Sequence, residues 1–154
     1  MEKFEARYNG DLANGLGNFA ARVLTLASDA KLQINVNDSE ITNEVNTNVS
    51  RKIQETAEIA AQKLEEFKLN EALEALWSLI HFGDRYVNEK KPWDKSLSEA
   101  DKINSIYNAV IILDNIAGLL SPFLPEVSGK ITRNIIWEKG VLKIKKGEAL
   151  FPRL

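Results

Sequence analysis

The sequence has no cysteine and only one histidine, His81, among its 154 residues. Without cysteine there is no disulfide framework and no thiolate ligand for a metal. A single histidine cannot build a multi-histidine metal centre or a pair of catalytic histidines. We therefore expect no metal site in this chain, and a reducing, cytoplasmic compartment suits its composition.

An excess of positive charge is also missing, since 20 Lys and Arg stand against 22 Asp and Glu. Any contact with nucleic acid must then be a local patch and not a general attraction for polyanions. No uninterrupted apolar run reaches the roughly 18 residues of a membrane span, and the first residues contain no apolar signal region. We expect a soluble single domain without a membrane partner.

What the sequence does contain is helical periodicity, with apolar residues recurring at steps of three and four. This pattern predicts an all-α bundle of about five helices, over residues 2–27, 39–67, 70–91, 98–120 and 126–137. Asp38 or Ser39 is expected to cap the second helix, and Ser98 with Asp101 resembles a capping box for the fourth. Residues 141–154 are expected to form a short extended tail.

Signals of catalysis are scarce. The first helix contains three glycines, which predicts a kink or the close approach of a neighbouring backbone. These glycines lack the lysine and the preceding strand of a phosphate-binding loop. The carboxylates are spread over solvent-facing helix surfaces. We therefore expect no catalytic residues in this chain.

Asn18 and Arg22 form a pair on the first helix. Their spacing of four residues places them on one side, separated by about 6 Å of helical rise. An amide and a guanidinium together offer the donors and the acceptor that the edge of a nucleobase requires. The alternative is structural, with Asn18 bonded to Arg22 or to a carbonyl of an adjacent helix.

Trp93 stands in a basic loop, directly after Pro92 and close to Lys90, Lys91 and Lys95. The ring either packs on the corner between the third and fourth helices or waits for an unstacked base. In the second interpretation the lysines face a phosphate backbone, and Arg85 joins them from one and a half turns earlier. Trp77 and Trp137 stand among apolar residues and are expected in the core.

Three motifs in this order resemble the anticodon-binding domain of class I aminoacyl-tRNA synthetases. They are RYNGDLANGLGNFAAR at residues 7–22, RYVNEKKPW at 85–93 and LFPRL at 150–154. The first two are shared by the methionyl, valyl, isoleucyl and leucyl branches, and the third is similar to the methionyl branch. The resemblance implies that Asn18, Arg22 and Trp93 bind a CAU anticodon. Trp93 would stack on the first base, the cytosine, and Pro92 would set the angle of its ring.

The resemblance also implies what surrounds this domain. No ATP-binding signature of the family occurs in the sequence, so residues 1–154 are expected to be an excised anticodon-binding domain without a cofactor. ATP would belong to the longer parent enzyme, and the partners would be the initiator and elongator methionine tRNAs, with no role for DNA. Two alternatives remain open: a sibling synthetase domain, or a helical protein-interaction module in which Trp93 is a hot spot.

Overall fold

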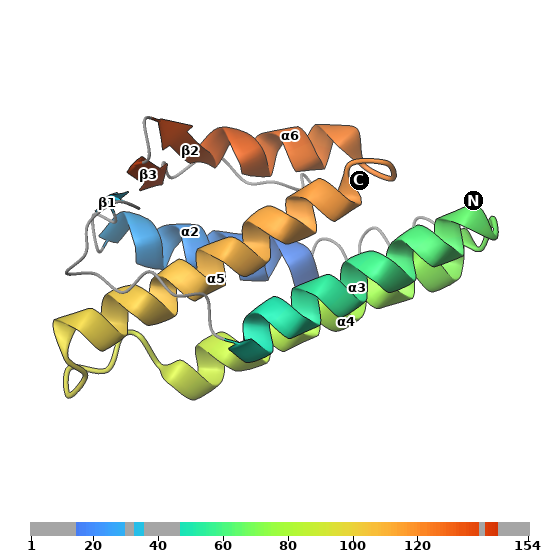
Figure 1. Ribbon diagram of the computed structural model, residues 1–154. Coiled ribbons are helices and arrows are strands. Elements are labelled where there is room, and N and C mark those ends of the chain that lie inside the picture. Colours follow the sequence, from blue (N-terminus) through green and yellow to red (C-terminus); the bar gives the residue numbers. More distant parts are fainter. Residues whose placement is uncertain (1–14, 30–32, 36–46, 139–140, 145–154) are drawn as a thin grey trace.

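The computed structural model describes residues 15–29, 33–35, 47–138 and 141–144 (Figure 1). Within them lie five helices and three short strands. The helices are α2 (Gly17–Asp29), α3 (Thr47–Glu65), α4 (Leu69–Lys90), α5 (Glu99–Leu120) and α6 (Pro125–Asn134), and the strands are β1 (Gln33–Asn35), β2 (Ile135–Glu138) and β3 (Val141–Ile144). The predicted helical bundle is confirmed. The expected cap of the second helix at Asp38 or Ser39 lies outside the described residues.

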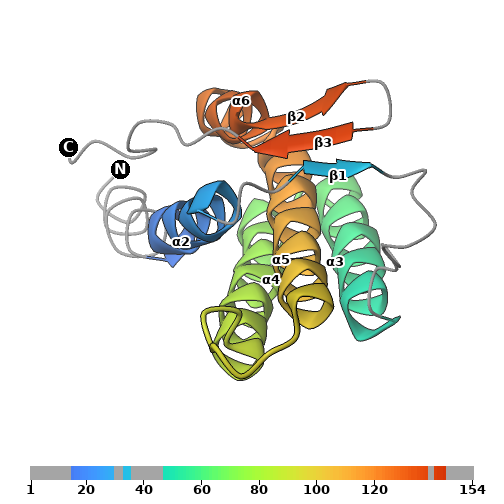
Figure 2. The same ribbon diagram turned by 90° about the vertical axis from the view of Figure 1, so that its left-hand side faces the viewer.

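The helices pack around α5, which lies beside the antiparallel pair α3 and α4 (Figures 1 and 2). Helix α2 flanks α4 and α5, while α6 and the strands cover another side of the bundle. By length and composition alone α5 could cross a membrane, but most of it is buried inside the protein, as suits a core helix. It starts where predicted, because the Ser98 Oγ accepts a hydrogen bond of 3.2 Å from the Asp101 N–H.

The end of the chain differs from the prediction at one point. The fifth helix was expected to continue to Trp137, but α6 ends at Asn134 and the backbone continues as β2. This strand pairs with β3 in antiparallel register, with Trp137 opposite Leu142, and β3 also pairs with β1. The run Ile135–Trp137 suits a strand as well as a helix, and the partner strand decides between them. The extended structure predicted for the tail is present in β3.

Helix α4 ends one residue before the loop that carries the tryptophan. Lys91 adopts the left-handed conformation, with φ 47° and ψ 61°, and its N–H donates to the Val87 carbonyl at 3.0 Å. A left-handed residue closes a helix because it turns the chain away from the axis. Pro92 follows and is buried. The chain therefore leaves α4 along a defined path, and that path determines where Trp93 lies.

One glycine brings α2 and α4 close together, and the sequence did not single it out. A Cβ added to Gly83 of α4 would lie 2.6 Å from the Phe19 ring of α2 and 3.0 Å from Ile112 of α5. The close approach expected at the glycines of the first helix is not found at Gly15, where an added Cβ would meet nothing within 4 Å. The close approach of the two helices is therefore made by Gly83 of α4 and not by Gly15.

Candidate nucleic-acid interface

Helix α2 buries one face and presents another to solvent. Phe19 and Val23 are buried in the core, whereas Asn18 is exposed and Arg22 is partly exposed. The i, i+4 pair therefore points away from the core, as its spacing predicted. Among the described residues no hydrogen bond joins Asn18 to Arg22, and Arg22 instead contacts side chains of α4.

Arg22 lies at the centre of a cluster drawn from three segments. Its Nη2 donates a hydrogen bond of 2.8 Å to the Asn88 Oδ1, and its Nη1 lies 3.4 Å from the Asp84 Oδ1. The guanidinium also sits over the Trp93 ring, 4.9 Å from the centroid. Such a cation–π contact contributes about 0.5–1 kcal/mol at an exposed site. Arg22 and Trp93, 71 positions apart in the sequence, are thus brought into one site.

Asp84 and Asn88 were not predicted as site residues, although they carry a recognisable pattern. They are four residues apart on α4 and therefore share one face of that helix. Their role depends on α2 lying alongside, which the close contact between Phe19 and Gly83 permits. Within the part of the chain that the structure describes, Asn88 and Asp84 occupy only part of the fork of guanidinium donors of Arg22.

Trp93 is half-exposed: it is not buried at the corner between α4 and α5, but it still contacts the protein. Its side chain is 48% exposed, while Pro92 beside it is buried. The loop is fixed on its other side by a turn, in which the Asp94 Oδ1 accepts from the Ser96 N–H at 2.9 Å and from the Ser96 hydroxyl at 2.8 Å. These bonds, the backbone one first, lower the pKa of the Asp94 carboxyl. The ring is held in place with much of its surface open to a ligand.

The expected phosphate contacts are also at the surface. Arg85, Lys90, Lys91 and Lys95 are all exposed, and none of them belongs to an ion pair among the residues that the structure describes. The Lys90 ammonium lies 5.9 Å from the centroid of the Tyr86 ring. Burial raises the pKa of Tyr86, so its phenol stays neutral beneath the lysine. The end of α4 and the loop after it combine a half-exposed aromatic ring with exposed cations.

This helical fold has counterparts among known proteins. A family profile described as "Anticodon-binding domain of tRNA ligase" matches residues 46–149. The chain belongs to this family of anticodon-binding domains. Within the family, the reported similarities lie with methionine–tRNA ligases, as the resemblance of the three motifs predicted.

Two relatives and one solved structure show the extent of this similarity. The chain is 33% identical to the methionine–tRNA ligase of Clostridium acetobutylicum over 99% of its own length and 26% of that protein. It is 31% identical to the enzyme of Methanopyrus kandleri, over 96% of this chain and 21% of that protein. The free methionyl-tRNA synthetase of Mycobacterium tuberculosis superimposes with a TM-score of 0.79 at 25% identity, over 99% of this chain and 34% of that chain. The chain spans about a quarter of the length of these curated relatives.

Proposed function

We propose that residues 1–154 form the anticodon-reading module of a methionine–tRNA ligase and recognise a CAU anticodon. The observation that carries the proposal is the position of the Arg22 guanidinium over the half-exposed Trp93 ring. A rigid donor fork and an open aromatic face, side by side, are what an unstacked RNA base needs for recognition by edge and by face. The family of the chain supports RNA as the ligand.

Each residue of the site has a distinct role in this proposal. Trp93 stacks on the first anticodon base, and the buried Pro92 holds the ring at its angle. Asn18 and Arg22 bond to base edges from the adjacent helix. Because Arg22 also contacts the Trp93 ring, base stacking and edge bonding are coupled, and loss of either side chain disturbs both.

The cations act differently from these base-reading residues. Arg85, Lys90, Lys91 and Lys95 contact phosphates, which position the RNA without reading its sequence. The expected partners are the initiator and elongator methionine tRNAs. In the longer enzyme this recognition would support the ATP-dependent attachment of methionine to tRNA in the cytoplasm, whereas this chain by itself binds RNA and performs no catalysis.

A comparison of two substitutions tests the proposal. Arg22→Ala should weaken binding of a CAU hairpin by about 1–3 kcal/mol and reduce discrimination against a hairpin altered at the cytosine. Lys90→Ala should weaken both hairpins alike and flatten the salt dependence, because it removes only a phosphate contact. Binding is measured by fluorescence anisotropy with labelled hairpins. An Arg22→Ala variant that loses the same affinity for both hairpins would contradict a reading role for Arg22.

A further inference from the structure

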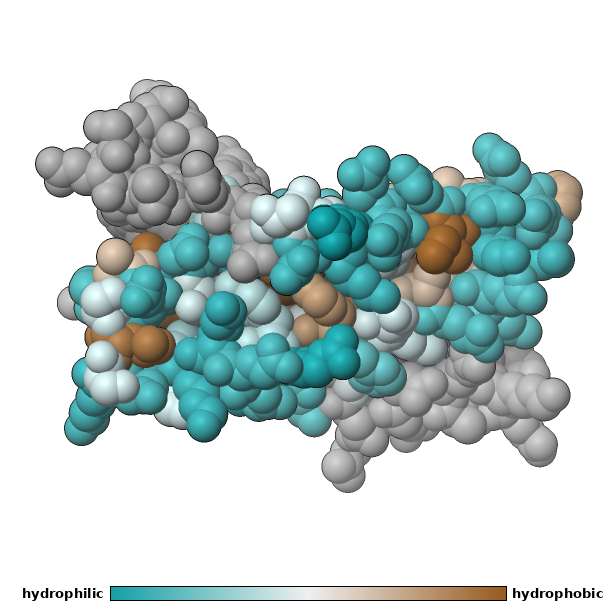
Figure 3. All heavy atoms as spheres, turned by 60° about the horizontal axis from the view of Figure 1, so that its bottom comes forward, coloured by the Kyte–Doolittle hydropathy of each residue, from teal (hydrophilic) through white to brown (hydrophobic). Residues whose placement is uncertain are grey.

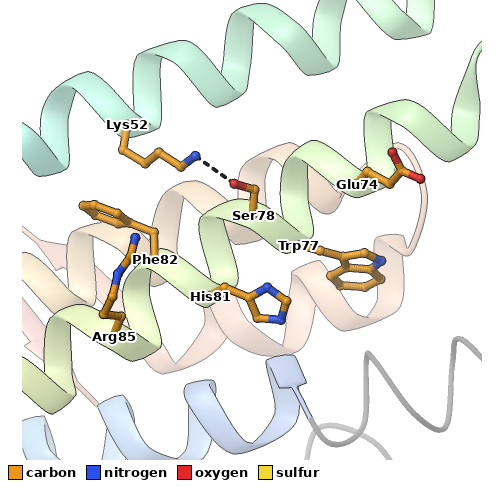
Figure 4. A pocket seen from close by; sticks show the side chains of 7 residues that line it. All are labelled: Lys52, Glu74, Trp77, Ser78, His81, Phe82 and Arg85. Atoms are coloured by element: carbon orange, nitrogen blue, oxygen red, sulfur yellow. Dashed lines mark hydrogen bonds between the residues drawn. The ribbon is translucent and has the colours of Figure 1, made fainter.

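A second surface feature lies on α4, away from the cluster around Arg22. Helices α3 and α4 border an open groove of about 610 Å³, named here the α3–α4 groove. Its lining is Lys52 from α3 and Glu74, Trp77, Ser78, His81, Phe82 and Arg85 from α4 (Figure 4). The groove therefore combines three aromatic rings with two permanent cations and one carboxylate.

We propose that the α3–α4 groove is a second RNA-contact site, which holds the sugar-phosphate strand next to the anticodon of the same tRNA. The inference rests on the function proposed above and extends its surface from Arg85, already a phosphate contact there, to Lys52, Trp77 and His81. Lys52 and Arg85 contact phosphates here, and the exposed His81 ring faces the strand between them.

Charge is the first support for RNA as the occupant. Among the described residues, neither Lys52 nor Arg85 is in an ion pair. The Lys52 ammonium reaches across to α4 and donates a hydrogen bond of 2.8 Å to the Ser78 hydroxyl, so it is held over the groove (Figure 4). Two such cations beside aromatic rings are the features with which proteins hold a nucleic-acid strand.

Continuity with the anticodon site is the second support. Trp77 and His81 of the groove are followed at steps of three and four residues by Asp84 and Asn88, the partners of Arg22, so all four lie along one face of α4. Along α4, His81 and Trp77 are seven and eleven residues before Asn88, or roughly 10–16 Å of helical rise. A stacked strand places one phosphate about every 3.4 Å, so the groove meets nucleotides roughly three to five positions from the base at Arg22.

The character of the surface disfavours a protein partner. The large hydrophobic side chains that are exposed in the described part of the chain are Ile59, Phe67, Leu69 and Trp93, and none of them lines the groove. Figure 3 shows a surface that is mostly hydrophilic over its described atoms, with separate small hydrophobic spots.

The test compares a CAU hairpin with a trinucleotide that contains only the anticodon. Lys52→Ala and Arg85→Ala should each reduce the slope of log affinity against log salt for the hairpin by about 0.7–0.9, with weaker binding at low salt. Lys52→Ala should leave binding of the trinucleotide unchanged, because the trinucleotide is too short to reach the groove. The matched control is Arg51→Ala, the same change of charge on the exposed neighbour of Lys52 that does not line the groove.

The outcomes separate this inference from the function on which it rests. If Lys52→Ala and Arg85→Ala behave like Arg51→Ala while Trp93→Phe still weakens the hairpin, the anticodon site stands and the groove is not an RNA site. If the hairpin does not bind at all, both proposals fail. A loss of slope with Lys52→Ala on the hairpin alone, absent with Arg51→Ala, establishes the groove as part of the interface.

Discussion

Substitution of Gly83 by alanine should destabilise the protein through one contact. The added methyl group would lie 2.6 Å from the Phe19 ring and 3.0 Å from Ile112. Carbon atoms prefer separations of about 3.5–4.0 Å, so the overlap is about 1 Å. Phe19 and Ile112 are both fully buried, so neither can move out into solvent without losing buried surface. Overpacking of this kind costs about 1–3 kcal/mol.

A second glycine provides the control. Gly118 also lies within a helix, but an added Cβ there would meet nothing within 4 Å. Alanine favours helix over glycine by up to about 1 kcal/mol at both positions, so this term largely cancels in the comparison. The free energy of unfolding of Gly83→Ala should therefore be about 1–3 kcal/mol below that of Gly118→Ala. For a domain of this size, each kcal/mol corresponds to about 2–4 °C in Tm.

Chemical and thermal unfolding of the two variants measure this difference, and a third variant identifies its cause. Phe19→Leu shortens the obstructing side chain, so it should be less harmful in the Gly83→Ala protein than in the parent. Because Arg22 is one turn from Phe19, Gly83→Ala should also weaken CAU binding in the folded protein. Equal stability of Gly83→Ala and Gly118→Ala would refute the reasoning, because it would show that α2 adjusts without cost.

Two further predictions concern the turns at the two ends of α4. Phe67, between α3 and α4, has φ 60° and is 91% exposed. Phe67→Asn should raise the free energy of unfolding by about 0.5–1 kcal/mol, because asparagine tolerates the left-handed region and no buried surface is lost. Thermal unfolding measures the change, and a lower Tm would contradict this explanation. At the other end, the hydrogen bonds from Ser96 lower the pKa of Asp94 below its ordinary value of 3.8. The turn is therefore fully stabilised above that value and loosens as the pH falls through the lowered pKa. Trp93 emission should report the loosening, and Asp94→Ala should abolish that step of the titration.

The helices with strong periodicity and clear ends could be predicted from the sequence. Helix α5 starts at its Ser98 cap, and α4 stops at the residue before Pro92, because local chemistry determines both points. The boundary of α6 could not be predicted in this way. Residues Ile135–Trp137 fit either period, and pairing with β3 selects the strand. The choice depends on a segment that lies elsewhere in the fold.

The candidate site was predicted in its parts but not in its assembly. The spacing of Asn18 and Arg22 and the basic surroundings of Trp93 identified the side chains, and the structure brings Arg22 and Trp93 together. Their role in reading an anticodon stays a prediction. Asp84 and Asn88 could not be assigned as partners of Arg22, because nothing local shows that α2 lies beside α4. The two helices meet closely where Gly83 of α4 lies against the Phe19 ring of α2, and the sequence does not show that these two residues are in contact.

The measurement that tests the central proposal most directly follows Trp93 fluorescence during titration with a CAU hairpin. A hairpin altered at the cytosine is the RNA control, and Trp93→Phe supplies the signal of Trp77 and Trp137. If a base stacks on the Trp93 ring, the CAU hairpin should quench the fluorescence. The altered hairpin should not quench it, and the Trp93→Phe protein should show no quenching with the CAU hairpin. Equal quenching by both hairpins, or CAU binding that leaves Trp93 emission unchanged, would contradict anticodon reading by this ring.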